Sequence, residues 1–324
     1  MKLATFRIAD EYTVVGAIVD RAGAPSMIVN LEAAHGAHSA RSVAFFSDMQ
    51  AFIEGGTTAQ DLAGELLERA DIEAPYAVAI ESANLLSPIP RPVQLRDFSV
   101  FEAHLRDAGV GLARLEARET RLAEPARDSG TVAQVYRDFP LFYFSNRMNV
   151  SGSGVQLNWP DEVELLDFEL EIAAVIGKTA KDIPTEEAAE HIFGYTIFND
   201  VSARDIQWRQ MKGYLGPCKA KSYDQCNVLG PWIVTRDEMP TAEGLKACVK
   251  VNGAPWIETQ VHGMVHSFAD MVAFASRGET VYAGEVFGSG TVGGCCGLEM
   301  DRWIKRGDRV ELEVEHIGTL VCNY

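Results

Sequence analysis

The sequence predicts a β-rich α+β protein with a small α/β domain at its N-terminus. From residue 139 onward, most apolar runs are short and bounded by Gly, Pro or Asn, as strands are, with a few helical segments between them. The Pro-rich stretch 87–92 can continue neither a helix nor a central strand, so it marks a boundary. We therefore predict a small N-terminal domain (1–93), a lid or linker segment (94–138) and a larger domain (139–324).

The first two parts carry mainly helical patterns after an initial pair of strands. In the N-terminal domain we predict strands at 6–10 and 12–19, joined by a turn at Asp10-Glu11, and helices at 47–53 and 59–70, the second capped by Thr57 or Thr58. Residues 97–124 form a charged helical pattern, followed by a polar loop. This segment is either a lid over an active site or a solvated linker helix.

The larger domain alternates strands with short helices. Its predicted elements are a buried strand at 166–177, a helix at 186–193, a strand at 195–198, an Asn-Gly hairpin within 249–254, a helix at 268–275 and an alternating strand at 310–315.

Composition excludes several classes of protein. A net charge of −17 argues against nucleic-acid binding and against docking on anionic membranes. No apolar run reaches 18 residues, and the first residues lack a signal-peptide core. The six cysteines form no CxxC pair, so a zinc ribbon or a disulfide framework is excluded and a reducing cytoplasm is expected.

Two glutamates on the strand 166–177 are the strongest sign of a site. Side chains in a strand alternate between its faces, so Glu169 and Glu171 emerge on the same face. Burying two like charges without a partner costs several kcal/mol, and a hard divalent metal is the simplest compensating cation. Asp200 ends the next apolar strand and is the best further ligand, although an aspartate there is by itself more often a helix N-cap.

Four ordered motifs resemble the fumarylacetoacetate hydrolase family over roughly residues 95–324. They are 166–177, 194–207 (GYTIFNDVSARDIQ), 216–234 (GPCKAKSYDQCNVLGPWIV) and 284–299 (GEVFGSGTVGGCCGLE). The resemblance implies a mixed β-sandwich roll with short helices, a homodimer, and a metal held by Glu169, Glu171 and Asp200. The metal would be Mg²⁺, or Mn²⁺ or Ca²⁺.

The same motifs imply further site residues. Lys221 would project into the site to stabilise a substrate carboxylate or enolate, whereas a lysine without that context is usually exposed. Arg204 and Gln207 resemble the family's substrate contacts, the alternative being a solvated helix face. Thr291, in a Gly-rich loop, resembles its substrate-carboxylate contact.

The segment 97–104 is similar to one that supplies a fourth metal ligand and a water-activating histidine in two-domain members of the family. Asp97 would be that ligand or a plain N-cap, and His104 would be the general base. Glu299 matches the family's acidic partner for this histidine, and Asp107 is the local rival, three residues away on the same helix face. The sequence does not choose between them.

Other candidates depart from the family or carry less chemistry. Many relatives have Phe-x-Lys-Pro where this chain has residues 142–148, and Arg147 would replace the missing lysine at the distal end of the substrate. Cys295-Cys296 is expected to pack, since no base is indicated for a nucleophile. The pair His262/His266 is expected to be structural because it lacks the Glu of HExxH.

These residues predict a metal-dependent hydrolase that cleaves a C–C bond of a 2,4-dioxo acid such as an acylpyruvate or fumarylpyruvate. Water activated by His104 attacks a carbonyl carbon, and Lys221 helps to stabilise the departing enolate. The alternative is a metal-dependent decarboxylase or isomerase of 2-oxo dicarboxylic acids, which needs no hydrolytic water. A non-catalytic relative would have lost the Glu pair or the lysine, and both are present.

Overall fold

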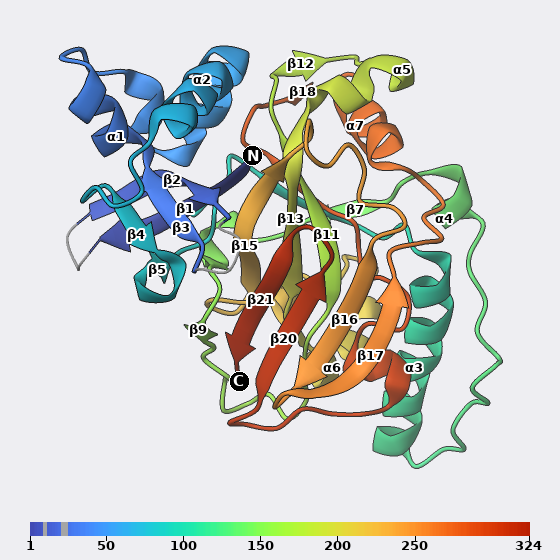
Figure 1. Cartoon of the computed structure of the whole chain (residues 1–324). Helices are drawn as coiled ribbons and strands as arrows, with labels where there is room; N and C mark the ends of the chain where they lie inside the picture. The colour runs from blue at the N-terminus through green and yellow to red at the C-terminus, as the bar shows by residue number, and fades with distance from the viewer. Residues whose placement is uncertain (9–11, 21–24) are drawn as a thin grey trace.

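The computed structural model describes residues 1–8, 12–20 and 25–324, so the turn predicted at Asp10-Glu11 lies outside the described residues. A long mixed sheet runs through the molecule and connects the N-terminal strands to those of the larger domain (Figure 1). Within the described part of the chain its order is β4-β3-β2-β1-β15-β13-β11-β19-β6-β7, with β5 on β1 and β8 on β15.

The strands of this sheet come from all three parts of the sequence. They are β1 (Lys2–Ile8), β2 (Tyr12–Val19), β3 (Met27–Asn30), β4 (Ala77–Ala79), β5 (Asn84–Leu85), β6 (Leu95–Phe98), β7 (Phe142–Phe144), β8 (Val150–Ser151), β11 (Leu170–Ile176), β13 (Ile192–Asp200), β15 (Asn227–Thr235) and β19 (Val286–Gly288). The strand predicted at 166–177 is interrupted: Leu166–Asp167 form a separate short strand, and β11 begins at Leu170, one residue after Glu169. Both faces of β11 are buried.

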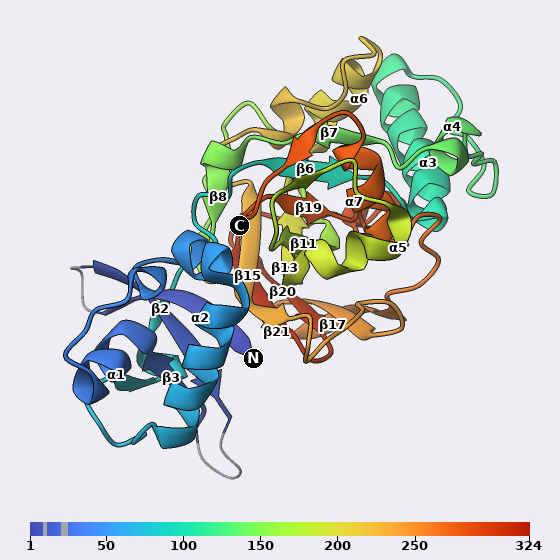
Figure 2. The same cartoon turned by 90° about the horizontal axis from the view of Figure 1, so that it is seen from above.

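A second sheet packs against the first and encloses the main core (Figures 1 and 2). Its order is β17-β16-β20-β21-β9, from β9 (Val155–Gln156), β16 (Lys246–Val251), β17 (Ala254–Gln260), β20 (Arg309–Val314) and β21 (Gly318–Asn323). Ile172 and Ile197 of the first sheet share one buried cluster with Val249 and Leu312 of the second. The prediction of a β-rich α+β fold with two packed sheets is confirmed.

Short helices and bridges complete the larger domain. They are α4 (Val135–Asp138), α5 (Thr185–Ala188), α6 (Arg204–Met211), α7 (Phe268–Ser276) and α8 (Gly297–Met300), with two-stranded pairs β10 (Leu166–Asp167) with β14 (Ser202–Ala203) and β12 (Ala180–Lys181) with β18 (Thr280–Val281), and 3₁₀ turns at Arg147–Asn149, Ala189–His191 and Lys219–Lys221. None of the described helices is both long and apolar enough to span a membrane.

The N-terminal helices are α1 (Leu31–His38) and α2 (Met49–Arg69), with 3₁₀ turns at Ala44–Phe46 and Ile80–Ser82. The two helices predicted at 47–53 and 59–70 are confirmed as two helical stretches within α2, which are separated at Gly56 by its non-helical φ of 55° and ψ of −138°. Asp48 caps the first stretch by accepting a hydrogen bond from the Ala51 N–H, 2.8 Å away. Thr57 and Thr58 directly follow Gly56, and a cap from either of them stays a prediction.

Several local predictions are confirmed in the larger domain. Asn252 and Gly253 both have positive φ and connect β16 to β17, as the hairpin signal requires. The helix predicted at 268–275 is α7, and the alternating strand at 310–315 is β20. The helix predicted at 186–193 is shorter, since β13 already begins at Ile192.

The segment 94–138 begins inside the main sheet and continues as a helix on its edge. β6 pairs in parallel with β19 and antiparallel with β7. The helix α3 (Glu102–Thr120) follows and packs against α6 and α8 along one side of the molecule (Figure 1). The division of the chain at residues 93 and 138 stays a proposal, and Leu95–Phe98 are sheet residues on either reading.

Candidate active site

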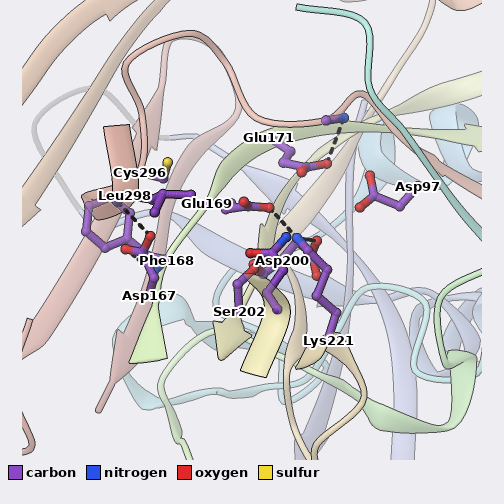
Figure 3. A network of polar contacts seen from close by, with 12 residues as sticks. Asp97, Asp167, Phe168, Glu169, Glu171, Asp200, Ser202, Lys221, Cys296 and Leu298 are labelled. Atoms are coloured by element: carbon purple, nitrogen blue, oxygen red, sulfur yellow. Dashed lines mark hydrogen bonds and ion pairs between the residues drawn. The ribbon is translucent and has the colours of Figure 1, made fainter. Parts of the chain in front are cut away.

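Neighbouring strands of the main sheet bring three carboxylates together. Asp97 lies on β6, Glu171 on β11 and Asp200 at the end of β13 (Figure 3). Between β6 and β11 runs β19, where Gly288 is paired with Asp97. A Cβ at Gly288 would lie 2.8 Å from Asp97 Oδ1 and 2.9 Å from Glu171 Oε2, so only glycine leaves room for both carboxylates.

The donor set fits a hard divalent cation. Ligand oxygens of Asp97, Glu171 and Asp200 all lie within 4.8 Å of one another, and all three residues are buried. One buried oxygen on each, namely Asp97 Oδ1, Glu171 Oε1 and Asp200 Oδ1, has no hydrogen-bond partner. Such oxygens cost free energy unless a cation compensates them, and oxygen-only shells are those that Mg²⁺, Mn²⁺ and Ca²⁺ prefer. Neither Asp97 nor Asp200 is a helix N-cap, since α3 and α6 are capped at Phe101 and Ala203.

Burial and mutual repulsion perturb these acids. Burial, followed by the charges of Asp97 and Asp200, raises the pKa of Glu171 well above its ordinary value. Burial also raises the pKa of Asp200, although Lys221 opposes the shift. Both shifts indicate that the cluster holds more negative charge than the chain alone can stabilise.

The fourth predicted ligand, Glu169, lies at the same site but is already paired. Its Oε1 is 2.7 Å from Arg204 Nη2 and its Oε2 accepts a 2.6 Å hydrogen bond from Lys221 Nζ. Burial raises the pKa of Glu169, but Lys221 and Arg204 outweigh burial and hold it below the ordinary value. Binding of a metal by Glu169 would require Lys221 to release it. Of the four predicted ligands, the three others present a free oxygen.

Lys221 is buried between two acids, contrary to the exposed alternative. Its ammonium also donates to Asp200 Oδ2, so it bridges Asp200 and Glu169 (Figure 3). Burial lowers the pKa of Lys221, but the two carboxylates outweigh burial and raise it above the ordinary value. The side chain is therefore a fixed cation that also lines the cavity described below.

Arg204 and Gln207 are buried, so the solvated-face alternative is wrong for both. Arg204 donates to Asp167 Oδ2 and to Gln207 Oε1, each at 2.8 Å. Asp167 in turn accepts from the backbone N–H groups of Gly297 and Leu298, at 2.8 and 3.0 Å. Arg204 thus holds Glu169 in place through its ion pair and does not line the cavity. Gln207 lines the cavity. Asp167 was missed, although it continues the every-second-residue spacing of Glu169 and Glu171.

His104 faces Glu299, and Asp107 does not take part. His104 Nδ1 lies 3.3 Å from Glu299 Oε2, and the Glu299 Oε1 accepts from the Gly294 N–H at 3.0 Å. Burial lowers the pKa of His104, but the Glu299 carboxylate outweighs burial and raises it. Asp107 pairs instead with Arg106 at 2.8 Å, so the predicted contact of Asp107 with His104 is not present.

Cys296 adds a contact that the sequence did not predict. Its thiol donates to Glu299 Oε2 at 3.1 Å, and burial together with Glu299 raises its pKa well above the ordinary value. Burial also raises the pKa of Cys295. Both shifts disfavour the thiolate that a nucleophile needs, in agreement with the expectation that the pair packs.

Tyr143 is a site residue that the sequence reasoning missed. Its hydroxyl donates to Asp97 Oδ2 at 2.6 Å and lies 2.8 Å from Asp200 Oδ2. Burial and these acids raise the pKa of Tyr143 well above its ordinary value, so the hydroxyl keeps its proton. The run Phe142–Phe144 carries only an aromatic pattern, which gives no signal for such a role.

A cavity of about 310 Å³ opens onto these groups. Asp97, His104, Glu169, Glu171, Gln207, Lys221 and Thr291 are the predicted residues that line it. Thr291 Oγ1 is buried there without a partner. Arg147 lies outside: its guanidinium donates to the Pro92 carbonyl at 3.0 Å, so the predicted contact with a substrate's distal end finds no support in the geometry. His262 and His266 lie next to backbone carbonyls, as expected of structural histidines.

Comparisons with known proteins agree with these motifs. Residues 115–323 match the family described as Fumarylacetoacetate (FAA) hydrolase C-terminal. The oxaloacetate tautomerase YisK of Bacillus subtilis (strain 168) is 33% identical over 76% of this chain and 74% of its own length. The maleylpyruvate hydrolase of Aquipseudomonas alcaligenes is 30% identical over 75% of this chain and 76% of its own length.

Solved structures show the same fold at lower identity. One is a maleylpyruvate hydrolase from Sphingobium sp. SYK-6, in complex with manganese(II) ion and pyruvate. It has a TM-score of 0.70 and 20% identity, and the match covers 100% of this chain and 98% of that one. The fold of this chain is therefore also found in proteins of much lower sequence identity.

Proposed function

The chain belongs to the fumarylacetoacetate hydrolase family, and from that premise we propose that it is a divalent-metal-dependent hydrolase of 2,4-dioxo carboxylic acids. In this reaction an acylpyruvate and water give a carboxylic acid and pyruvate. The observation that carries the proposal is His104, which faces Glu299 and lines the same cavity as Asp97, Glu171 and Lys221.

The proposed metal ligands are Asp97, Glu171 and Asp200, joined by Glu169 if Lys221 moves. When bound, Mg²⁺ or Mn²⁺ would act as a Lewis acid that polarises substrate oxygens and orients the dioxo group. The manganese ion bound in the Sphingobium maleylpyruvate hydrolase supports a divalent metal at this site. Tyr143 reduces the repulsion between the carboxylates of Asp97 and Asp200, because its hydroxyl lies within hydrogen-bond distance of both.

His104 is the proposed general base. With Nδ1 turned to Glu299, its Nε2 is the nitrogen left for water. In the proposed step Nε2 takes a proton from water as the water oxygen bonds to the acyl carbonyl carbon. The bond between that carbon and the methylene then breaks, and the electron pair passes to the pyruvate enolate, which takes a proton to give pyruvate. Lys221 is close enough to the acidic cluster to stabilise the negative charge of the enolate or the carboxylate.

Thr291 and Gln207 are the proposed substrate contacts. Thr291 Oγ1 is buried, unpartnered and lines the cavity, so it can donate to a substrate carboxylate at no cost to another bond. The Gln207 side chain accepts from Arg204 and can therefore offer its amide N–H₂ to the substrate.

The alternative, tautomerisation or decarboxylation of a 2-oxo diacid, is favoured by the similarity of this chain to YisK, an oxaloacetate tautomerase. That chemistry needs the acidic cluster and Lys221 but no water-activating base. The test measures pyruvate release from an acylpyruvate and enol–keto exchange of oxaloacetate, both with Mn²⁺, in the wild type and in His104→Ala. The proposal expects pyruvate release to be lost in the variant. If the wild type releases no pyruvate and exchanges oxaloacetate equally well with and without His104, the hydrolase proposal fails.

The preference for Mg²⁺, the homodimer and the cytoplasmic location stay predictions. Light scattering on the purified protein tests the dimer, and turnover with Mg²⁺, Mn²⁺ and Ca²⁺ in parallel tests the metal.

A further inference from the structure

The cavity continues away from the acidic cluster along one face of α3. Leu105, Ala108, Gly109 and Leu112 line it, beginning one residue after His104. Their spacing places them on a single stripe of the helix. Because each helical residue rises 1.5 Å, Leu112 lies about 12 Å farther along the axis than His104. The cavity therefore has a chemical end and a long extension.

Apolar groups from other segments also line the cavity. They are Leu141 and Phe142, directly before and at the start of β7, Met211 at the end of α6, and Pro217 in the segment after that helix. Tyr136 of α4 adds one hydroxyl, which can form a hydrogen bond but cannot balance a charge. The extension thus offers a surface for carbon, with little for a charged group.

Cations are lacking in the extension. Among the described residues, the basic side chains that line the cavity are His104 and Lys221, both at the chemical end. Four basic residues on or next to α3, α4 and α6 are paired with acids that do not line the cavity: Arg106 with Asp107, Arg137 with Glu102, Arg209 with Glu119 and Lys212 with Glu116. A carboxylate in the extension would give up part of its hydration and meet no cationic partner there.

Gly109 keeps the extension open. A Cβ added there would meet no atom within 4 Å, so packing does not require glycine at this position. Gly111 on the same helix is different, because its Cβ would lie 2.7 Å from the Leu298 side chain. A glycine inside a helix is less favourable than alanine. Gly109 is exposed, and the open space beside it adjoins the cavity that this residue lines.

We propose that this stripe is a subsite for an unbranched apolar acyl chain, so that the substrate is a monocarboxylic acylpyruvate with a medium-length tail and not a dioxo diacid. The acyl subsite consists of Leu105, Ala108, Gly109, Leu112 and Met211. This inference rests on the proposed function, because the acyl carbonyl must lie at His104 for its tail to follow α3. It separates this chain from the similar maleylpyruvate hydrolase, whose substrate is a diacid.

The first experiment measures kcat/KM of the Mn²⁺-loaded protein for acetyl-, butyryl-, hexanoyl- and octanoylpyruvate and for fumarylpyruvate. Each methylene that enters the subsite should raise kcat/KM about fourfold, until the chain reaches the end of the cavity. Fumarylpyruvate should be poorer than hexanoylpyruvate. A flat length series, or fumarylpyruvate as the best substrate, overturns the subsite while leaving the proposed function intact. Cleavage of no dioxo acid overturns the proposed function and the subsite with it.

The second experiment moves the selectivity with two variants. Gly109→Phe should lower the octanoyl-to-acetyl ratio of kcat/KM at least tenfold, because the ring fills the extension. Met211→Arg should raise the fumaryl-to-hexanoyl ratio at least tenfold, and Met211 is 39% exposed, so the fold should tolerate the change. Ala113→Phe on the exposed face of α3 and Tyr214→Arg, at a residue 95% exposed, are the matched controls and should leave both ratios unchanged. Unchanged ratios in both subsite variants, with native circular dichroism, refute the inference.

Discussion

Replacing Glu171 by Gln should abolish the stabilisation of the folded protein by a divalent metal. Glu171 supplies one of three buried free oxygens that face one another, and its neighbours Asp97 and Asp200 supply the others. Glutamine keeps the size of the side chain but removes its charge. Two carboxylates then remain, and the amide can donate a hydrogen bond to either of them.

The magnitude follows from mass action and from the pKa shift. A metal at a hundred times its dissociation constant stabilises the wild type by about 2.7 kcal/mol, and the variant should lose this increment. Without metal the effect reverses in sign. Burial and neighbouring acids raise the pKa of Glu171 in the folded state, so the folded protein holds a proton that the unfolded chain releases above about pH 4.3. The free energy of unfolding of the metal-free protein therefore falls as pH rises above about 4.3. The total loss is about 1.4 kcal/mol for each unit by which the folded-state pKa of Glu171 exceeds its unfolded-state pKa, and the Glu171→Gln variant would not share this loss.

The assay is urea unfolding at pH 5.5 and pH 8, with EDTA or with saturating Mn²⁺. The metal should stabilise the wild type more at pH 8 than at pH 5.5, and the metal-free Glu171→Gln protein should equal or exceed the metal-free wild type at pH 8. Glu313→Gln is the control, since Glu313 forms a solvent-screened surface pair with Lys250 that contributes little to stability. An undiminished metal response in Glu171→Gln, or its destabilisation without metal, would refute this account of the cluster.

Three further predictions concern the base and the metal cradle. His104→Ala should lower kcat for an acylpyruvate about 10²- to 10⁴-fold in steady-state assays, whereas Asp107→Asn should change kcat less than about twofold. Comparable losses in the two variants would contradict the assignment of Glu299 as the partner of His104. Since a general base must be neutral, kcat/KM should fall as pH drops through the raised pKa of His104. Glu299→Gln should shift this acid limb of the pH–rate profile to lower pH, and a profile that does not move would exclude the pairing of Glu299 with His104. Gly288→Ala should weaken Mn²⁺ binding at least tenfold in calorimetry, because its Cβ would lie within 3 Å of two ligand oxygens; unchanged affinity would show that the cradle can widen.

Local patterns were enough to find the centre of the site. The alternation within 166–177 and the end of the following apolar strand depend only on neighbouring residues, so Glu169, Glu171 and Asp200 could be read from the chain. The Asn252-Gly253 turn is local in the same sense. At these positions backbone geometry alone fixes where a side chain points.

Partners that come from distant segments could not be found in that way. Asp97 reaches the cluster through the parallel pairing of β6 with β19, and the two strands are separated by about 190 residues of sequence. His104 and Glu299 also come from distant segments that the fold brings together. Without the family resemblance, the nearer Asp107 was an equal candidate for the acidic partner of His104. Tyr143 gave no signal, because an aromatic residue in an apolar run is read as core. Arg147 was expected at the substrate because a positive charge was missing from a motif, but a motif gives no direction for a side chain.

The buried charges around the site do not balance within the chain. Among the described residues, two cations, Arg204 and Lys221, are buried there against five carboxylates, which are Asp97, Asp167, Glu169, Glu171 and Asp200. The protein can reduce the excess by retaining protons, as the raised pKa of Glu171 and of Asp200 indicates, or by binding a divalent cation. Protons become scarce as pH rises, while the affinity for a metal increases because ligands must be deprotonated. Proton and metal therefore compete for the same oxygens. Lys221, whose raised pKa keeps it charged, reduces the repulsion between Glu169 and Asp200 by bridging them.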